Sequence, residues 1–146
     1  MMKFSDVTPF RLVRSLGLAG PQNPAIYLLI CDAPAAAAVE ADLQAETAVQ
    51  LGGSIHVSTA SQVLRDSLPA WHDGSTRLIY FDAWLPDLVA ALDRHSAVLV
   101  QDGGQLLLLA DEKSAERLLS GAPNLRSRLT DVFQIGPDDF PGGLPT

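Results

Sequence analysis

The stretch Arg77-Leu78-Ile79-Tyr80-Phe81-Asp82-Ala83-Trp84 decides the fold, because four large apolar residues run directly into one carboxylate. A short apolar run that is rich in β-formers is typical of a strand buried on both faces, as in parallel sheets that helices cover. Asp82 then lies at the carboxyl end of this strand, where ligands bind in open α/β sheets. The same position also suits a structural role, in which Asp82 caps the helix that begins near Pro86. Both interpretations of Asp82 stay open at this point.

The same pattern, an apolar run that ends at an acid, occurs twice more in the chain. Residues 25–31 precede Asp32, and residues 105–110 precede Asp111. Two shorter strands are predicted at 54–58 and 132–135. Helices are predicted to start at Thr8-Pro9 and to cover 35–51, 59–68, 86–95 and 112–119. This alternation predicts a three-layer α/β/α fold with a mainly parallel five-stranded sheet.

The helical period also predicts which side chains face the core. Phe10, Val13 and Leu16 of the first helix are expected to point inward, and so are Val63, Leu64 and Leu68 of the third. The helix at 35–51 is expected to carry an acidic outer face, formed by Glu40, Asp42 and Glu46. Residues 97–104 either continue the preceding helix, the interpretation we favour, or form a hairpin across Asp102-Gly103-Gly104.

Length and composition indicate one domain and narrow the possible partners. A chain of 146 residues forms one core, so we expect one domain over 1–136 and a flexible tail over 137–146, which is rich in Gly, Pro and Asp. A formal charge of −7 argues against nucleic acid as a partner. The chain has no apolar segment of bilayer-spanning or signal-peptide length and only one cysteine, Cys31, which together predict a cytoplasmic protein.

Residues that could carry chemistry are few. Asp32, Asp82 and Asp111 end three predicted strands and so share one edge of the sheet, where they could bind Mg²⁺. Each also precedes a predicted helix, and we favour helix capping over a metal site. The three histidines have no second ligand at a metal-binding spacing. Cys31 lacks a base that would activate it as a nucleophile. We therefore predict no catalytic residue, no metal and no cofactor.

The loop after the first predicted strand reads Cys31-Asp32-Ala33-Pro34-Ala35-Ala36-Ala37-Ala38-Val39. A phosphate-binding loop at this place needs glycines, a lysine and a hydroxyl, and all of them are missing. Asp32 would repel phosphate, and Pro34 removes one amide donor. The sequence therefore predicts that phosphate does not bind here.

Apart from that loop, residues 25–138 resemble the core of AAA+ and related signal-transduction (STAND) P-loop ATPases. Leu78-Ile79-Tyr80-Phe81-Asp82 looks like a Walker B strand, and residues 106–111 look like the strand that carries the sensor residue. Residues 123–129 followed by 132–135 are similar to the arginine-finger segment and the last strand of that core. Walker A is missing, Ala83 stands where the catalytic glutamate would be, and Ala110-Asp111 replaces the polar sensor.

The resemblance implies a P-loop-NTPase-like fold that has lost its activity, as in inactive STAND-like modules of bacterial signalling and conflict systems. Such a module acts on a protein partner, such as an ATPase or a signalling protein. Asn124, Arg126 and Arg128 are then the expected interaction residues, because arginine holds carboxylates in a bidentate fork. Arg126 and Arg128 can equally be solvated charges at a helix end.

A second family, the receiver domain of response regulators, is also similar at Phe81-Asp82-Ala83-Trp84-Leu85-Pro86-Asp87. That likeness implies a degenerate switch domain that uses Asp82. The chain lacks the paired acids and the lysine of a receiver. Strand order distinguishes the two families. The ATPase core places the last predicted strand beside the first and inserts the fourth between the first and the third, whereas a receiver keeps the first and the third adjacent.

Overall fold

In a computed structural model, which describes residues 4–19, 24–66, 76–97 and 104–137, the chain folds around one all-parallel sheet. Its strands are β1 (Ser5–Val7), β2 (Ala25–Ile30), β3 (His56–Thr59), β4 (Thr76–Tyr80), β5 (Gln105–Ala110) and β6 (Asp131–Ile135). They lie side by side in the order β1-β6-β2-β5-β4-β3. The predicted α/β class and parallel sheet are confirmed, but the sheet has six strands.

The extra strand, β1, pairs only with β6, with Ser5 opposite Phe133. Three residues give no readable alternation of apolar and polar side chains, so the sequence pattern could not reveal it. The other strands fall where they were predicted, within two residues. β2 and β5 are buried along their whole length and form the centre of the sheet.

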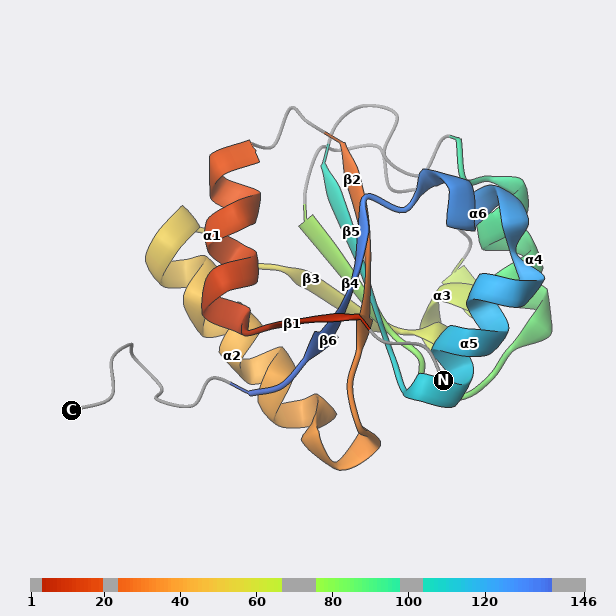
Figure 1. Ribbon diagram of the computed structural model, residues 1–146, viewed down its shortest axis with the longest axis horizontal. Helices are drawn as coiled ribbons and strands as arrows, with labels where there is room; N and C mark the ends of the chain where they lie inside the picture. The colour runs from red at the N-terminus through yellow and green to blue at the C-terminus, as the bar shows by residue number, and fades with distance from the viewer. Residues whose placement is uncertain (1–3, 20–23, 67–75, 98–103, 138–146) are drawn as a thin grey trace.

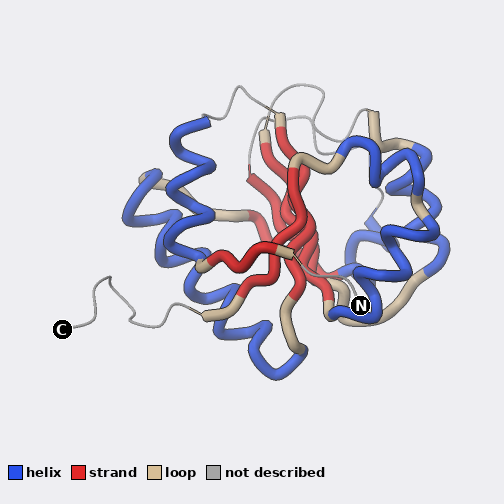
Figure 2. Tube along the Cα trace, viewed as in Figure 1, coloured by secondary structure: helices blue, strands red, loops and turns tan. Residues whose placement is uncertain are grey.

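Helices cover both faces of the sheet, as Figure 1 shows. On one face lie α1 (Pro9–Ala19) and α2 (Ala36–Leu51), and the short 3₁₀ turn η1 (Ala33–Ala35) leads into α2. On the other face lie α3 (Ala60–Asp66), α4 (Pro86–Arg94), α5 (Glu112–Gly121) and α6 (Pro123–Arg128). Figure 2 shows the resulting three layers, with the strands between two groups of helices. No helix among the described residues is long and apolar enough to span a bilayer.

Alternation along the central strands creates one apolar core on each face. Ile26, Leu28 and Ile30 of β2 pack under α3 to α6, and Tyr27 and Leu29 pack under α1 and α2. Successive side chains of a strand point to opposite faces, and both faces are covered here. The near-continuous apolar runs of β2 and β5 follow from this double burial.

Several predicted helix faces and ends need correction. Phe10 is 39% exposed and Leu64 is 43% exposed, whereas Leu12 replaces Phe10 in the core of α1. Both residues follow the helical period, but they lie at the margin of the buried stripe, which is set by the neighbouring elements. Leu68, which was also expected to point inward, lies outside the described residues.

The outer face of α2 is also not acidic. Glu46 is only 8% exposed, Glu40 and Asp42 are half-buried, and the exposed positions of the helix are occupied mainly by alanines. The predicted end of this helix is confirmed, because Gly52 has φ 71°, the left-handed conformation that ends helices.

The helix that begins at Pro86 does not continue into residue 97. α4 ends at Arg94, and residues 95–97 form a turn. The hairpin alternative involves residues 98–103, which lie outside the described residues. The same holds for residues 138–146 of the predicted tail.

Candidate functional site

The three strand-end acids lie at the same edge of the sheet but have different roles. β5 lies between β2 and β4, so Asp111 follows the middle strand of the three. Its carboxylate accepts a hydrogen bond of 2.7 Å from the backbone N–H of Ser114, in the first turn of α5. Asp111 is therefore the N-cap of α5, as predicted.

Asp82 also stabilises a helix, but not the predicted one. Its carboxylate accepts hydrogen bonds from the backbone N–H of Ser61 at 3.3 Å and from the Ser61 hydroxyl at 3.0 Å. Ser61 lies in the first turn of α3, whereas α4 is preceded by Leu85, which provides no side-chain cap. The prediction that Asp82 caps α4 is wrong, because Ala83 to Leu85 separate the acid from that helix.

The start of α3 is stabilised from two sides. Thr59 and Gln62 form a reciprocal capping box: the Thr59 hydroxyl accepts from the Gln62 N–H at 3.2 Å, and the Gln62 side chain accepts from the Thr59 N–H at 2.9 Å. Asp82 adds bonds to Ser61 from the neighbouring strand end. This pairing of distant residues has no sequence signal, although the capping box itself could have been predicted.

Asp32 does not cap a helix at all. The carboxylate makes no capping bond, and the Asp32 carbonyl instead accepts from the Ala35 N–H at 2.9 Å, which closes the η1 turn. The preceding Cys31 is 6% exposed. Burial, and secondarily the charge of Asp32, raises the pKa of the Cys31 thiol, so the thiol is protonated and a poor nucleophile.

The three acids do not form a metal site in this structure. Within the described part of the chain, no three His, Cys, Asp or Glu side chains lie close enough together to hold a metal ion. The carboxylates of Asp82 and Asp111 are already hydrogen-bonded to helix starts. At this edge, Trp84 is covered instead by the Arg117 guanidinium, 4.5 Å from the ring centre, which links the β4–α4 loop to α5.

Of the three predicted interaction residues, Asn124 is structural. The Asp93 carboxylate accepts from the backbone N–H groups of Asn124 at 2.7 Å and Leu125 at 3.0 Å, and from the Asn124 side chain at 3.2 Å. Asp93 of α4 thus caps α6 from outside. Sequence reasoning missed Asp93, although one signal was available: an acid in the last turn of a helix is disfavoured by the helix dipole and needs another role.

Arg126 and Arg128 are exposed in the last turn of α6 and line different hollows. Arg128 lies at a hollow of about 460 Å³ beside Pro24 and Ser96, at the start of β2. Arg126 lies at a hollow of about 440 Å³ between α5, α6 and β6. The two arginines therefore do not form one continuous surface.

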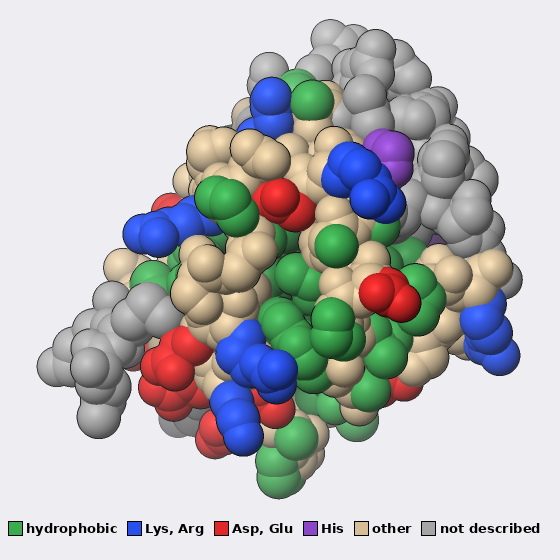
Figure 3. Space-filling view, turned by 90° about the vertical axis from the view of Figure 1, so that its right-hand side faces the viewer, with side chains coloured by type: hydrophobic (Ala, Val, Ile, Leu, Met, Phe, Trp, Pro, Cys, Tyr) green, Lys and Arg blue, Asp and Glu red, His purple; other side chains and the backbone are tan. Residues whose placement is uncertain are grey.

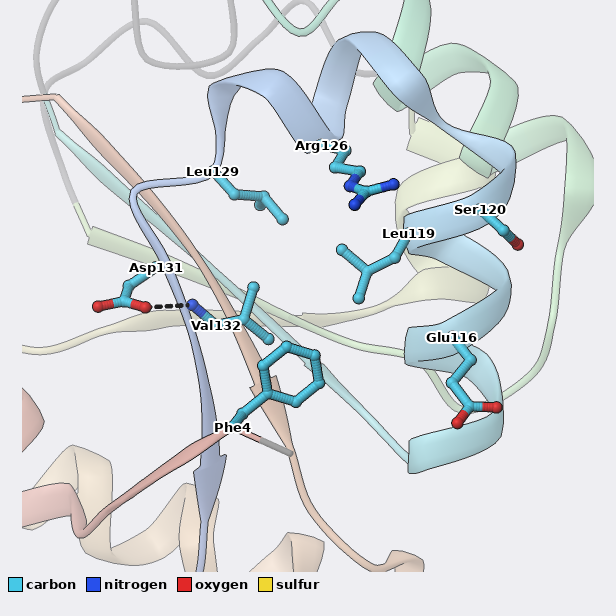
Figure 4. A pocket seen from close by; sticks show the side chains of 8 residues that line it. All are labelled: Phe4, Glu116, Leu119, Ser120, Arg126, Leu129, Asp131 and Val132. Atoms are coloured by element: carbon cyan, nitrogen blue, oxygen red, sulfur yellow. Dashed lines mark hydrogen bonds between the residues drawn. The ribbon is translucent and has the colours of Figure 1, made fainter. Parts of the chain in front are cut away.

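The Arg126 hollow combines an apolar floor with one guanidinium. Figure 4 shows Phe4, Leu119, Leu129 and Val132 pointing toward one another, with Arg126 next to them. Phe4, Leu129 and Val132 are half-buried, although they pack against the core of this face. Figure 3 shows apolar side chains gathered on this face, with charged ones around them.

The charges around this hollow are arranged asymmetrically. The Asp131 carboxylate accepts from the Val132 N–H at 2.8 Å, and in Figure 4 both Asp131 and Glu116 point away from the apolar floor. The guanidinium of Arg126 has no hydrogen bond or ion pair with the residues that the structure describes, although its backbone N–H and carbonyl are bonded within and at the end of α6. A ligand group with an apolar part and a carboxylate would therefore fit here, because the floor can contact its apolar part and Arg126 can bind its carboxylate.

The comparisons with known proteins do not place the chain in a family. No protein-family model matches it, and searches of curated proteins and of solved structures found no match.

Proposed function

We propose that this chain is a catalytically inactive, ATPase-like interaction module, which binds a protein partner at the Arg126 hollow. The observation that carries the proposal is the Arg126 guanidinium, which has no partner among the described residues and lies beside three half-buried apolar side chains. Aromatic and aliphatic anchors in such pockets, together with arginine, supply most of the binding energy of protein interfaces. A partner segment with a carboxylate next to a large apolar residue fits this site.

Strand order supports the relation to the ATPase core. β6 lies beside β2, and β5 lies between β2 and β4, which is the order expected for that core. The receiver alternative requires β2 and β4 to be adjacent, and its switch acid, Asp82, is occupied by Ser61. No observation favours the receiver alternative over the ATPase-like one.

The chemistry of the β2–α2 connection supports the absence of nucleotide binding. A phosphate would meet the Asp32 carboxylate there, Pro34 has no N–H, and the Ala35 N–H is already bonded to Asp32. Isothermal titration with ATP and Mg²⁺ tests this half of the proposal. We expect no binding up to millimolar ATP, and micromolar affinity would contradict it.

The partner site is tested by crosslinking in cells of the source organism. A photoreactive residue at Glu116, on the rim of the hollow, should capture a specific protein that the same residue at the exposed Ala90 of α4 does not. The captured partner is then purified, and its affinity for the wild type and for Arg126→Glu is measured. We expect a loss of at least about tenfold, since arginine hot spots cost more than 1 kcal/mol when removed, and unchanged affinity would exclude this site.

A further inference from the structure

The outward face of α2 carries no charged side chain over more than three helical turns. Its exposed positions between residues 37 and 49 are Ala37, Ala38, Ala41, Ala45, Ala48 and Val49. The carboxylates of the helix lie at the margins of this face or beneath it, and Glu46 is buried. A helix at the surface of a monomer normally places charged residues on its outer side, so this side of α2 has the composition of a covered one.

Larger apolar side chains extend this surface onto α1. Leu18 is 82% exposed, Val49 81% and Leu51 40%. Together with Phe10 they are four of the five large apolar side chains that are exposed in the described residues. The ends of the two helices touch, because a Cβ built on Gly17 would lie 2.8 Å from the Leu51 side chain. We call the outward side of the two helices, with Leu18, Ala41, Ala45, Val49 and Leu51, the α1–α2 face.

The charges beside the α1–α2 face are opposite on the two helices. α1 carries Arg11 and Arg14 and no acid, and both arginines are exposed on the same side as Leu18, at the i, i+3 and i+7 positions. α2 carries three acids and no cation. A twofold axis would place α1 of one chain against α2 of the other, and the reverse contact follows by symmetry. Each contact would then bring arginines to carboxylates.

We propose that the chain forms a homodimer through the α1–α2 face, with Arg14 of each chain near Glu40 of the other. The alanines of α2 let α1 of the other chain approach closely, and the side chains of Leu18 and Val49 become buried in the contact. This inference does not depend on the proposed function, because the Arg126 hollow lies in the opposite helical layer.

The size of the face indicates a weak dimer. Residues 37–49 of α2 span about 18 Å, and two helices packed about 9 Å apart offer an area on the order of 350 Å². This is about half of what each partner buries in an interface of standard size. We therefore expect a dissociation constant of about 10–100 µM, because so small an area does not by itself provide tight binding.

Sedimentation equilibrium of the full chain between about 5 and 500 µM measures this association. We expect Ala45→Glu to weaken it at least about tenfold, because two carboxylates would be buried at the twofold contact. Ala90→Glu, the same change at an exposed alanine of α4, should have no effect. Thermal melting followed by circular dichroism checks that both variants are folded. A wild type that is monomeric at the highest concentration, or a dimer that tolerates Ala45→Glu, would overturn the proposal.

A charge exchange tests the orientation of the two chains. Arg14→Glu and Glu40→Arg should each weaken the dimer, and the double variant should restore it, since charge pairs across an interface couple. Failure of the double variant to recover affinity excludes this twofold arrangement. Pelleting with vesicles of anionic phospholipid is run in parallel, and binding of a monomeric wild type to these vesicles would assign the face to a membrane surface instead. Arg126→Glu should dimerise like the wild type, which separates this proposal from the partner site.

Discussion

The turns after β2 and β5 begin alike, lie next to each other, and differ in what their acid does. Each follows a buried apolar strand and has an aspartate within its first two residues, Asp111 directly after β5 and Asp32 after Cys31. Asp111 bonds the Ser114 N–H at 2.7 Å and starts α5 directly. Asp32 bonds no N–H with its side chain, and α2 starts only after the η1 turn.

The 3₁₀ turn η1 explains the difference. In both turns the third residue after the aspartate is the one whose N–H a cap bonds. After Asp32, Pro34 follows at the second position and the chain takes a 3₁₀ turn, in which the Ala35 N–H bonds the Asp32 carbonyl. An acid at a strand end is therefore a cap only if the next three residues enter an α-helix at once.

The largest expected effect is the protection of the Cys31 thiol from modification in the turn after β2, whose helix has no side-chain cap. Cys31 is buried, and its Sγ lies 3.2 Å from the Asp32 carbonyl, to which it donates. We expect iodoacetamide at pH 8 to modify it at least about a hundredfold more slowly than in the urea-unfolded chain, since reaction requires opening. Rates within tenfold of each other would show that the turn opens readily.

The raised pKa of Cys31 also gives a direction for stability against pH. The folded state holds the thiol proton more tightly than the unfolded state, in which the pKa is about 9.0. This contribution is therefore fully present below that pH and decreases as the pH rises above it. Urea denaturation of the wild type and of Cys31→Ala at pH 8 and pH 10 checks the sign: only the wild type should lose stability through this group.

The next largest effect, a loss of stability, is expected at Asp93 of α4, which caps the neighbouring helix α6. Asp93→Ala removes three hydrogen bonds at the start of α6 and should lower the free energy of unfolding by about 2 kcal/mol, the upper end for lost caps. Asp87→Ala, an exposed acid of the same helix α4, is the matched control. A loss below about 0.5 kcal/mol for Asp93→Ala would mean that water replaces the cap.

Two substitutions, Asp111→Ala and Asp32→Ala, directly test the difference between the turns after β5 and β2. The first should cost about 1 kcal/mol, because it removes the cap of α5, and Asp111→Ser should recover most of it. The second should change stability by less than about 0.3 kcal/mol, as surface substitutions without a partner do. Urea denaturation measures both, and equal losses would refute the distinction between the two turns.

Among the acids that bond the start of a helix, Asp82 is expected to show the smallest effect. Asp82→Ala should cost about 0.5 kcal/mol, at the low end for caps, because the Thr59–Gln62 capping box still holds the start of α3. A double-mutant cycle with Ser61→Ala measures the coupling through the Ser61 hydroxyl. If stability is unchanged and binding of Mg²⁺ disappears instead, Asp82 is a switch residue rather than a structural one.

The fold could be predicted from the sequence because each buried strand is an uninterrupted run of apolar residues. The runs at 25–31, 77–81 and 105–110 leave few alternatives to buried parallel strands. Contacts between residues far apart in the sequence could not be predicted in this way. The bond between Asp82 and Ser61 depends on β3 lying beside β4, and the cap from Asp93 to α6 depends on α4 lying beside α6.

The candidate site was predicted only in part. Arg126 was singled out because of a resemblance, but its hollow also needs Phe4, which precedes a strand too short to be recognised. The composition of α2 shows a related limit. Glu40, Asp42 and Glu46 indicated an acidic outer face, and only the rotation of the helix on the sheet places alanines there instead.

The strand order also bears on how the chain folds during synthesis. β2, the third strand from the β1 edge, has β5 and β6 as neighbours, and β1 has only β6. Ser5 pairs with Phe133, so β1, which is synthesised first, cannot pair until β6 has been synthesised. Sheets dominated by such distant pairings fold slowly. A ribosome must therefore release nearly the whole domain before the sheet closes, and until then the edge of β2 that pairs with β6 has its backbone N–H and C=O groups unpaired.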